Sequence, residues 1–143
     1  MSRFNIRVYG IWINDSNEIL LSDERVGEFH FTKFPGGGLE LGEGIIDCLI
    51  REWKEELDSD IEVAEHIYTT DFFQISAFDD SQIISIYYKV KPINFPAFIL
   101  ENKVFDFEKK NQDEYRFRWK LLSDLTENDL TLPIDKRVVA LLK

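Results

Sequence analysis

The sequence predicts a mixed α/β fold, and three observations support this prediction. Short apolar segments rich in β-branched and aromatic residues alternate with turn sequences, which is typical of strands. Residues 44–57 have apolar residues at intervals of three and four, the period of an amphipathic helix. Hydrophobic residues make up 44% of the 143 residues and aromatic residues 14%. This composition favours one compact domain, residues 1–143, over a disordered chain.

The first third of the chain predicts extended segments. Residues 5–13 are rich in isoleucine, valine and aromatic residues and predict a buried strand. The turn sequence at 14–17 precedes a second strand that starts at 18–21, so a hairpin is the simplest interpretation. Residues 27–34 form a third extended segment. The three glycines at 36–38 then predict a loop, because glycine adopts backbone conformations closed to other residues.

The rest of the chain continues the alternation. The helix at 44–57 has six apolar residues on its predicted core side: Ile45, Ile46, Leu49, Ile50, Trp53 and Leu57. Further strands are expected at three segments: 61–73, 82–90 and 115–122. Residues 91–112 contain Pro92, Pro96 and charged clusters, and predict a long, partly ordered connection. A final helix is expected with Thr131 as N-cap and Pro133 in its first turn.

Charge and cysteine content exclude several classes of protein. A net charge of −10 argues against a groove for duplex nucleic acid, which needs clustered lysine and arginine. Cys48 is the only cysteine, so no intramolecular disulfide forms. The N-terminus has no apolar signal core, and no segment is long and apolar enough to span a membrane. We expect a cytoplasmic protein without membrane partners.

Three glutamates on the predicted helix are candidates for chemistry. Glu52, Glu55 and Glu56 are spaced at i, i+3 and i+4, so their side chains fall on one stripe. Glu52 and Glu56 border the apolar side, where bare carboxylates are costly to desolvate and repel each other. A divalent cation removes both difficulties, and oxygen ligands suit Mg²⁺ or Mn²⁺. The alternative is an acidic, solvated helix face.

Arg51 lies on the same helix, and helical projection directs it away from the carboxylate stripe. We therefore interpret Arg51 as an ion-pair partner that orients carboxylates of the loop or the helix, rather than as a phosphate contact.

The stretch GGGLELGEGIIDCLIREWKEE, residues 36–56, resembles the Nudix box. In that pattern a glycine, a glutamate, an arginine–glutamate pair and a glutamate pair stand at fixed intervals. The matching positions are Gly37, Glu43, Arg51, Glu52, Trp53, Glu55 and Glu56. Two positions depart from it, because Asp58 stands where the box has a glycine and Ser59 where it has an apolar residue. Both departures concern the turn that ends the helix.

The resemblance implies a fold and an activity. Nudix domains are α/β/α sandwiches around a mixed sheet. They hydrolyse a diphosphate linkage in a nucleoside diphosphate linked to a further group or in a nucleoside triphosphate, usually with Mg²⁺. By that analogy Glu52, Glu55 and Glu56 bind the metal, the Gly37 carbonyl adds a ligand, and Glu43 supports the site from outside. The bound cation would explain how an acidic protein binds an anion.

Other roles are less closely defined by the box. Glu55 is one candidate for the general base, and Asp113 or Glu114, just before the strand at 115–122, is another. The alternative is that the latter two are ordinary loop charges.

Contacts with the substrate are also open. Arg7 and Lys33 are candidate phosphate contacts, and Phe72 is a candidate for stacking on a base, although core packing or solvent exposure is the alternative for each.

Two other functions compete with catalysis. A Nudix-like regulatory domain would bind a nucleotide or metabolite without cleaving it, but relatives of that kind often lose box carboxylates, and none is lost here. A plain interaction domain with an accidental motif is the third hypothesis. The partner we expect is a small nucleotide or nucleotide derivative, and a homodimer is plausible from family habit. Substrate specificity is not predictable, because loops outside the box determine it.

Overall fold

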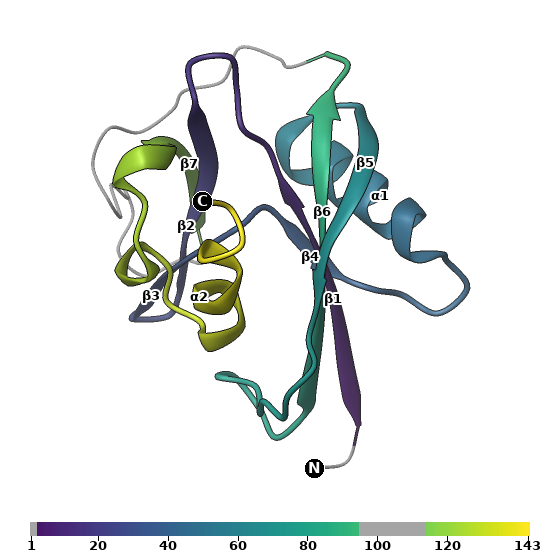
Figure 1. Ribbon diagram of the computed structural model, residues 1–143. Helices are drawn as coiled ribbons and strands as arrows, with labels where there is room; N and C mark the ends of the chain where they lie inside the picture. The colour runs from purple at the N-terminus through teal and green to yellow at the C-terminus, as the bar shows by residue number, and fades with distance from the viewer. Residues whose placement is uncertain (1–2, 95–113) are drawn as a thin grey trace. The chain divides into compact units, whose positions relative to one another are not determined.

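A computed structural model describes residues 3–94 and 114–143, which form two compact units (Figure 1). The first unit consists of β1 (Phe4–Ile11), β4 (Gly36–Gly38), α1 (Ile45–Leu57), β5 (Ile61–Thr69) and β6 (Gln82–Pro92). The second consists of β2 (Glu18–Val26), β3 (Phe29–Lys33), β7 (Glu114–Leu121), the short 3₁₀ helices η1 (Leu122–Asp124) and η2 (Glu127–Asp129), and α2 (Pro133–Val139). The predicted mixed α/β class is confirmed, and the single domain stays a prediction.

The first unit is built on a four-stranded mixed sheet in the order β4, β1, β6, β5. Strands β1 and β6 run parallel, whereas β4 and β5 pair antiparallel with their neighbours. Helix α1 packs on this sheet, where the indole of Trp53 lies against Gly10: a Cβ there would come within 2.7 Å of the indole nitrogen. Trp53 is fully buried. Gly10 therefore provides the space that lets the helix approach β1.

Only part of the apolar pattern of α1 is buried. Cys48, Leu49, Trp53 and Leu57 form the buried stripe. Three isoleucines predicted on the core side are partly exposed instead: Ile45 (36%), Ile46 (47%) and Ile50 (38%). The stripe that contacts the sheet is thus narrower than the apolar pattern.

Helix α1 ends at Asp58 with the backbone conformation that a C-terminal glycine usually adopts. Asp58 adopts the left-handed conformation, with φ at 50°. Its N–H donates to Lys54 O, and the N–H of Ser59 donates to Trp53 O, which are the bonds of a left-handed helix cap. Ser59 is buried, and its hydroxyl donates to Asn94 O at 2.6 Å. Both departures from the box therefore fit a regular helix end.

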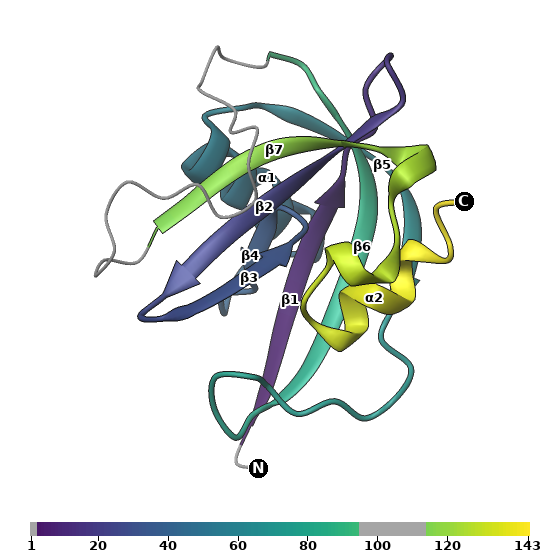
Figure 2. The same cartoon turned by 90° about the vertical axis from the view of Figure 1, so that its left-hand side faces the viewer.

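The second unit contains a three-stranded antiparallel sheet in the order β3, β2, β7, which lie side by side in Figure 2. The predicted hairpin between the first two strands is wrong. Asn14 does form the turn, since its side-chain oxygen accepts from the N–H groups of Ser16 and Glu18. However, both edges of β1 pair with β4 and β6, so β2 pairs with β3 and β7 instead, and an isolated bridge joins Ile13 to Ile19.

The predicted glycine loop is a short strand, β4, paired with β1. Glycine is needed here because the backbones approach closely: a Cβ on Gly36 would lie 2.1 Å from Val8 O, and the φ of Gly36 is +155°. The predicted loop is therefore wrong, because the segment is a strand. The expectation that this segment needs glycine agrees with the close backbone approach at Gly36.

Two expectations near the C-terminal half need correction or lie partly outside the described residues. The N-cap of α2 is Leu132 and not Thr131, whose hydroxyl instead accepts from the N–H of Thr32 at 2.8 Å. Pro133 does begin the helix as predicted. Strand β6 continues to Pro92, and residues 95–112 of the predicted connection lie outside the described residues. No helix in the described part of the chain is long and apolar enough to cross a membrane.

Candidate active site

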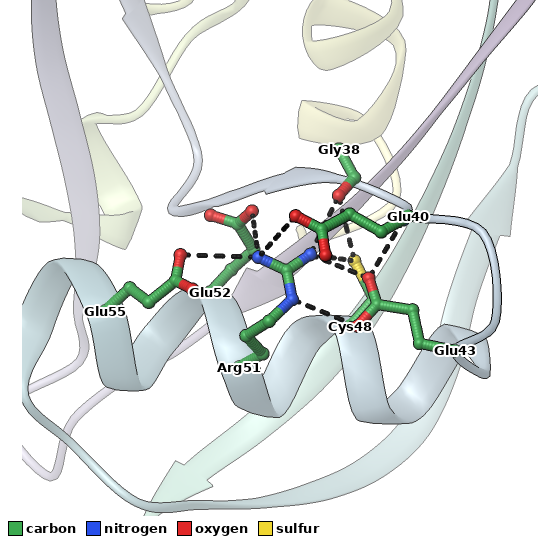
Figure 3. A network of polar contacts seen from close by, with 7 residues as sticks. All are labelled: Gly38, Glu40, Glu43, Cys48, Arg51, Glu52 and Glu55. Carbon is green, nitrogen blue, oxygen red and sulfur yellow. Dashed lines mark hydrogen bonds and ion pairs between the residues drawn. The ribbon is translucent and has the colours of Figure 1, made fainter.

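Arg51 stands at the centre of the polar network on α1 (Figure 3). Its guanidinium forms ion pairs with Glu43 at 2.7 Å, Glu52 at 2.9 Å, Glu55 at 3.3 Å and Glu40 at 3.8 Å. The prediction that Arg51 points away from the carboxylates is therefore wrong. The reason is that helical projection gives the direction in which a side chain leaves the helix, and not the position of the charged group at the end of a long side chain. The ion-pair partnership that we inferred for it does agree with these contacts.

The same guanidinium joins the box loop to the helix. Its Nε and Nη2 donate to the two oxygens of Glu43 at 3.0 and 2.7 Å, a paired geometry that makes such hydrogen bonds strong. Nη2 also donates to Gly38 O at 3.0 Å. Glu43 in turn accepts from the backbone N–H of Glu40 at 2.9 Å. Arg51 and Glu43 therefore fix the loop between β4 and α1 relative to the helix.

These contacts change the protonation equilibria of the cluster. Hydrogen bonding to Arg51, together with the Glu40 N–H, lowers the pKa of Glu43 to about 2. The pKa of Arg51 is raised, mainly by its hydrogen bonds with Glu43. Burial, followed by the nearby charge of Glu43, raises the pKa of the Cys48 thiol to about 12. Cys48 therefore stays protonated near neutral pH, which agrees with a packing role.

Gly37 allows Glu52 to lie against the sheet. A Cβ on Gly37 would lie 2.4 to 2.6 Å from the carboxylate of Glu52, so a larger residue would displace this carboxylate. The Glu52 side chain is 13% exposed, whereas that of Glu55 is 58% exposed. Glu56 is partly buried, and one of its carboxylate oxygens is buried. The three box glutamates thus differ in their contact with solvent.

The expected convergence of these three carboxylates on one point is not observed. In residues 3–94 and 114–143, no three side chains of the His, Cys, Asp or Glu type are gathered closely enough to hold a metal ion. Glu52 and Glu55 contact Arg51 instead, because carboxylates repel each other and approach the nearest cation. The set still suits a hard divalent cation in its chemistry: the donors are oxygens, and four carboxylates surround one guanidinium.

The register of β4 bears on the proposed backbone ligand. Gly10 N–H donates to Pro35 O, and Leu39 N–H donates to Ile6 O. Because bonding alternates along an antiparallel pair, Gly37 opposite Val8 directs its carbonyl toward β1. The carbonyls of Gly36 and Gly38 point away from β1. The metal role of the Gly37 carbonyl stays a prediction, and this register favours a neighbouring carbonyl for it.

Two of the remaining candidates belong to the second unit. Lys33 is buried, pairs with Glu24 at 2.9 Å and donates to Phe34 O. The Glu114 side chain is 10% exposed and lies between Arg25 at 3.6 Å and Arg116 at 3.4 Å. These contacts are those of structural charges, so their roles as substrate contact and general base stay predictions.

Two further candidates, Arg7 and Phe72, lie in the first unit. Arg7, on β1, is half-buried and donates from Nε to the hydroxyl of Tyr9 at 3.0 Å. Phe72 is half-buried in the connection between β5 and β6. Asp113 lies outside the described residues. The structure thus brings Arg51, Glu43, Glu52 and Glu55 together.

Sequence analysis missed two members of the network. Glu40 contributes an ion pair and a backbone donor, and Gly38 contributes its carbonyl. Glu40 has a usable signal, since it lies three residues before Glu43 in the same loop and can close a turn with it. Gly38 has no such signal in the sequence, because it contributes a backbone carbonyl and every residue has one.

The described site consists of a carboxylate-rich helix that packs beside a glycine strand on a mixed sheet. We compared the chain with known protein families to identify the class of protein that has this site. The NUDIX domain model matches residues 4–141. The chain therefore belongs to the NUDIX domain family, the family of the Nudix hydrolases.

Solved structures agree on the fold. A NUDIX hydrolase from Nitrosomonas europaea is similar with a TM-score of 0.72 and 18% identity, over 97% of this chain and 88% of that one. A MutT NUDIX hydrolase from Burkholderia pseudomallei gives 0.69 and 21%, over 99% and 100%. An ADP-ribose pyrophosphatase from Streptococcus suis gives 0.61 and 17%, over 96% and 88%. The expected Nudix-like fold is thereby confirmed. No match was found among curated proteins.

Proposed function

We propose that this protein hydrolyses a diphosphate linkage in a nucleoside diphosphate derivative or a nucleoside triphosphate, with Mg²⁺ as cofactor and Mn²⁺ as a substitute. The observation that supports this proposal most strongly is the cluster around Arg51, where four carboxylates meet a single guanidinium beside a strand without side chains. Such an excess of negative charge suits a divalent cation better than it suits a structural ion pair.

In this proposal the residues of the box have two kinds of role, metal binding and positioning. Glu52, Glu55 and Glu56 hold the metal, together with a carbonyl of β4. When bound, a divalent cation neutralises the diphosphate and lowers the pKa of the attacking water. Arg51 positions Glu52 and Glu55 through its ion pairs, and Glu43 holds Arg51 in place. Both are positioning residues.

The general base is assigned to Glu55. Its carboxylate is the more exposed of the two that Arg51 holds on the helix, so it can reach a water molecule. Glu114 is a weaker candidate, because its carboxylate is 10% exposed and is already paired with Arg25 and Arg116.

Cellular location, partners and assembly are proposed by analogy with the same family. We place the protein in the cytoplasm, as a single domain that acts on a small nucleotide and not on duplex nucleic acid or a membrane. Arg7, Lys33 and Phe72 are kept as candidate substrate contacts, and a homodimer as the candidate assembly.

A substrate screen tests this function. Purified protein is incubated with Mg²⁺ and with dinucleotides, nucleotide sugars or modified nucleoside triphosphates, and phosphate or pyrophosphate release is measured. We expect Mg²⁺-dependent release that falls about 10²- to 10³-fold in Glu56→Gln, since a metal ligand contributes several kcal/mol. Glu62→Gln, an exposed change on β5, is the matched control. Folded protein that binds these compounds without cleaving them would favour the regulatory-domain hypothesis instead.

A further inference from the structure

Arg51 has two sets of partners, which lie on opposite sides of its guanidinium (Figure 3). Nε and Nη2 donate to the carboxylate of Glu43 at 3.0 and 2.7 Å, and Nη2 also donates to Gly38 O at 3.0 Å. Nη1 donates to Glu52 at 2.9 Å and to Glu55 at 3.3 Å. Together these contacts use every N–H donor that a guanidinium possesses.

The two sets of contacts differ in strength. Glu43 is 16% exposed and accepts two parallel hydrogen bonds, an arrangement that is strong and specific. The contact with Glu55 is weaker, because that side chain is 58% exposed and lies one turn further along the helix surface. Glu52 is less exposed, but it accepts one hydrogen bond from the guanidinium. Nη1 is therefore the side of Arg51 that can release its partners while Nε and Nη2 stay on Glu43.

The two carboxylates that Nη1 contacts are proposed metal ligands. One nitrogen atom donates to both Glu52 and Glu55, so it lies between them, where a cation shared by both carboxylates would also lie. Within residues 3–94 and 114–143, no three acidic, histidine or cysteine side chains are gathered closely enough to hold a metal ion. Binding of a divalent cation therefore requires these carboxylates to move, and the bonds to Nη1 hold them in place.

We propose that Arg51 competes with the metal: its Nη1 releases Glu52 and Glu55 when a divalent cation binds, whereas Nε and Nη2 remain on Glu43. This inference rests on the proposed function and describes how the same site exchanges one cation for another. Because Glu43 keeps the guanidinium nearby, Nη1 can return to the two carboxylates when the cation leaves.

The competition and the positioning role of Arg51 affect different quantities. Positioning of the carboxylates determines turnover when the metal is saturating, whereas competition determines how tightly the metal binds. The competing explanation is that Arg51 only orients the carboxylates, and in that case its loss weakens metal binding. The two explanations therefore predict opposite changes in metal affinity.

Mn²⁺ binding to the full chain, measured by titration calorimetry, separates these explanations. Arg51→Met removes the charge and keeps an unbranched side chain. We expect its Mn²⁺ affinity to rise about three- to tenfold, because a cation is removed from between two ligand carboxylates. Weaker Mn²⁺ binding than in the wild type, or equal binding, would overturn the proposal.

Lys54→Met is the matched control. Lys54 is a cation of the same helix that pairs with Asp58 at 3.3 Å and Asp60 at 3.7 Å, outside the box cluster. Its removal should change Mn²⁺ affinity by less than about twofold, because solvent and salt screen exposed charges. A rise equal to that in Arg51→Met would show a general effect of net charge and would overturn the proposal.

The arginine side-chain signals of the isotope-labelled wild type test the exchange by nuclear magnetic resonance without a mutation in the sample. Mg²⁺ is added until the site is saturated, and the signals of Arg51 are assigned from their absence in Arg51→Lys. We expect the Nη1 protons to exchange faster with water once Glu52 and Glu55 are released. The Nε proton, bound to Glu43, should keep its protection.

The same spectra provide the contradicting outcomes. Unchanged protection of the Nη1 protons at saturating Mg²⁺ would overturn the proposal, and so would loss of protection at Nε. A folded wild type that takes up neither Mn²⁺ nor Mg²⁺ would instead overturn the proposed function.

Discussion

Charged side chains gather in two regions of this protein, and their balance differs. On α1, Glu40, Glu43, Glu52 and Glu55 surround the single guanidinium of Arg51. In the sheet of the second unit, three carboxylates each contact at least one cation. The pairs there are Asp23 with Arg118, Glu24 with Lys33, and Glu114 with Arg25 and Arg116.

The difference in charge balance distinguishes charges that stabilise the fold from charges that suit the binding of a ligand. The pair of Asp23 and Arg118 is buried, and Asp23 also accepts from the hydroxyl of Thr32 at 2.7 Å. A buried pair that is matched and hydrogen-bonded specifies a packing arrangement. The cluster on α1 is partly exposed and keeps an excess of negative charge, which suits the binding of a cation. Charge balance, rather than charge density, therefore distinguishes the candidate site from the structural network.

Arg118→Met should produce the largest effect on stability. It leaves the carboxylate of Asp23 buried without its ion-pair partner, which costs about 3–5 kcal/mol of unfolding free energy. Urea denaturation measures the change. Turnover per folded molecule should be unaffected; a loss of turnover larger than the loss of folded protein would mean that this network also serves the reaction.

Arg51→Lys should affect activity more than stability. Lysine keeps the charge but cannot bind Glu43 through two nitrogens while also reaching Glu52. We expect turnover to fall about 10- to 100-fold, the usual effect of losing a group that orients metal ligands. Steady-state kinetics at saturating Mg²⁺ measures it. Native turnover in this variant would show that the carboxylates need no such orientation.

Glu43 should make the cluster sensitive to acid. Its pKa falls from 4.5 to about 2 on folding, so its contribution to stability is complete above about pH 4.5 and is lost as the pH falls toward 2. We expect Glu43→Gln to be less stable than the wild type at neutral pH. The difference should shrink between pH 4.5 and 2, as thermal unfolding across that range would measure. A difference independent of pH would show that the hydrogen bonds alone, and not the charge, stabilise the loop.

Local sequence signals predicted the helix and the ion-pair partnership of Arg51, but not that Glu40 belongs to the cluster. Glu43, Arg51 and Glu52 lie within ten consecutive residues, so one loop and one helix determine their contacts. The direction of Arg51 was wrong, because helical projection places the Cα and not the end of a long flexible side chain.

Pairing between distant segments was not predictable. Paired residues of β1 and β6 are 78 positions apart in the sequence, and those of β2 and β7 are 89 to 103 positions apart. Nothing in the intervening turns specifies either partner. The same limit applies to the buried ions. The ion pair of Lys33 with Glu24 was not predictable, because the two residues become neighbours only through the β2–β3 ladder.

Mn²⁺ binding followed by electron paramagnetic resonance tests the central claim, that the carboxylates of α1 bind a divalent cation, most directly. The wild type should bind Mn²⁺ and release it on addition of Mg²⁺, and Glu52→Gln should bind at least tenfold more weakly. Glu65→Gln, which removes an exposed carboxylate paired with Lys89, should bind as the wild type does. Equal affinity in Glu52→Gln and the wild type, or no Mn²⁺ uptake by the folded wild type, would contradict the account.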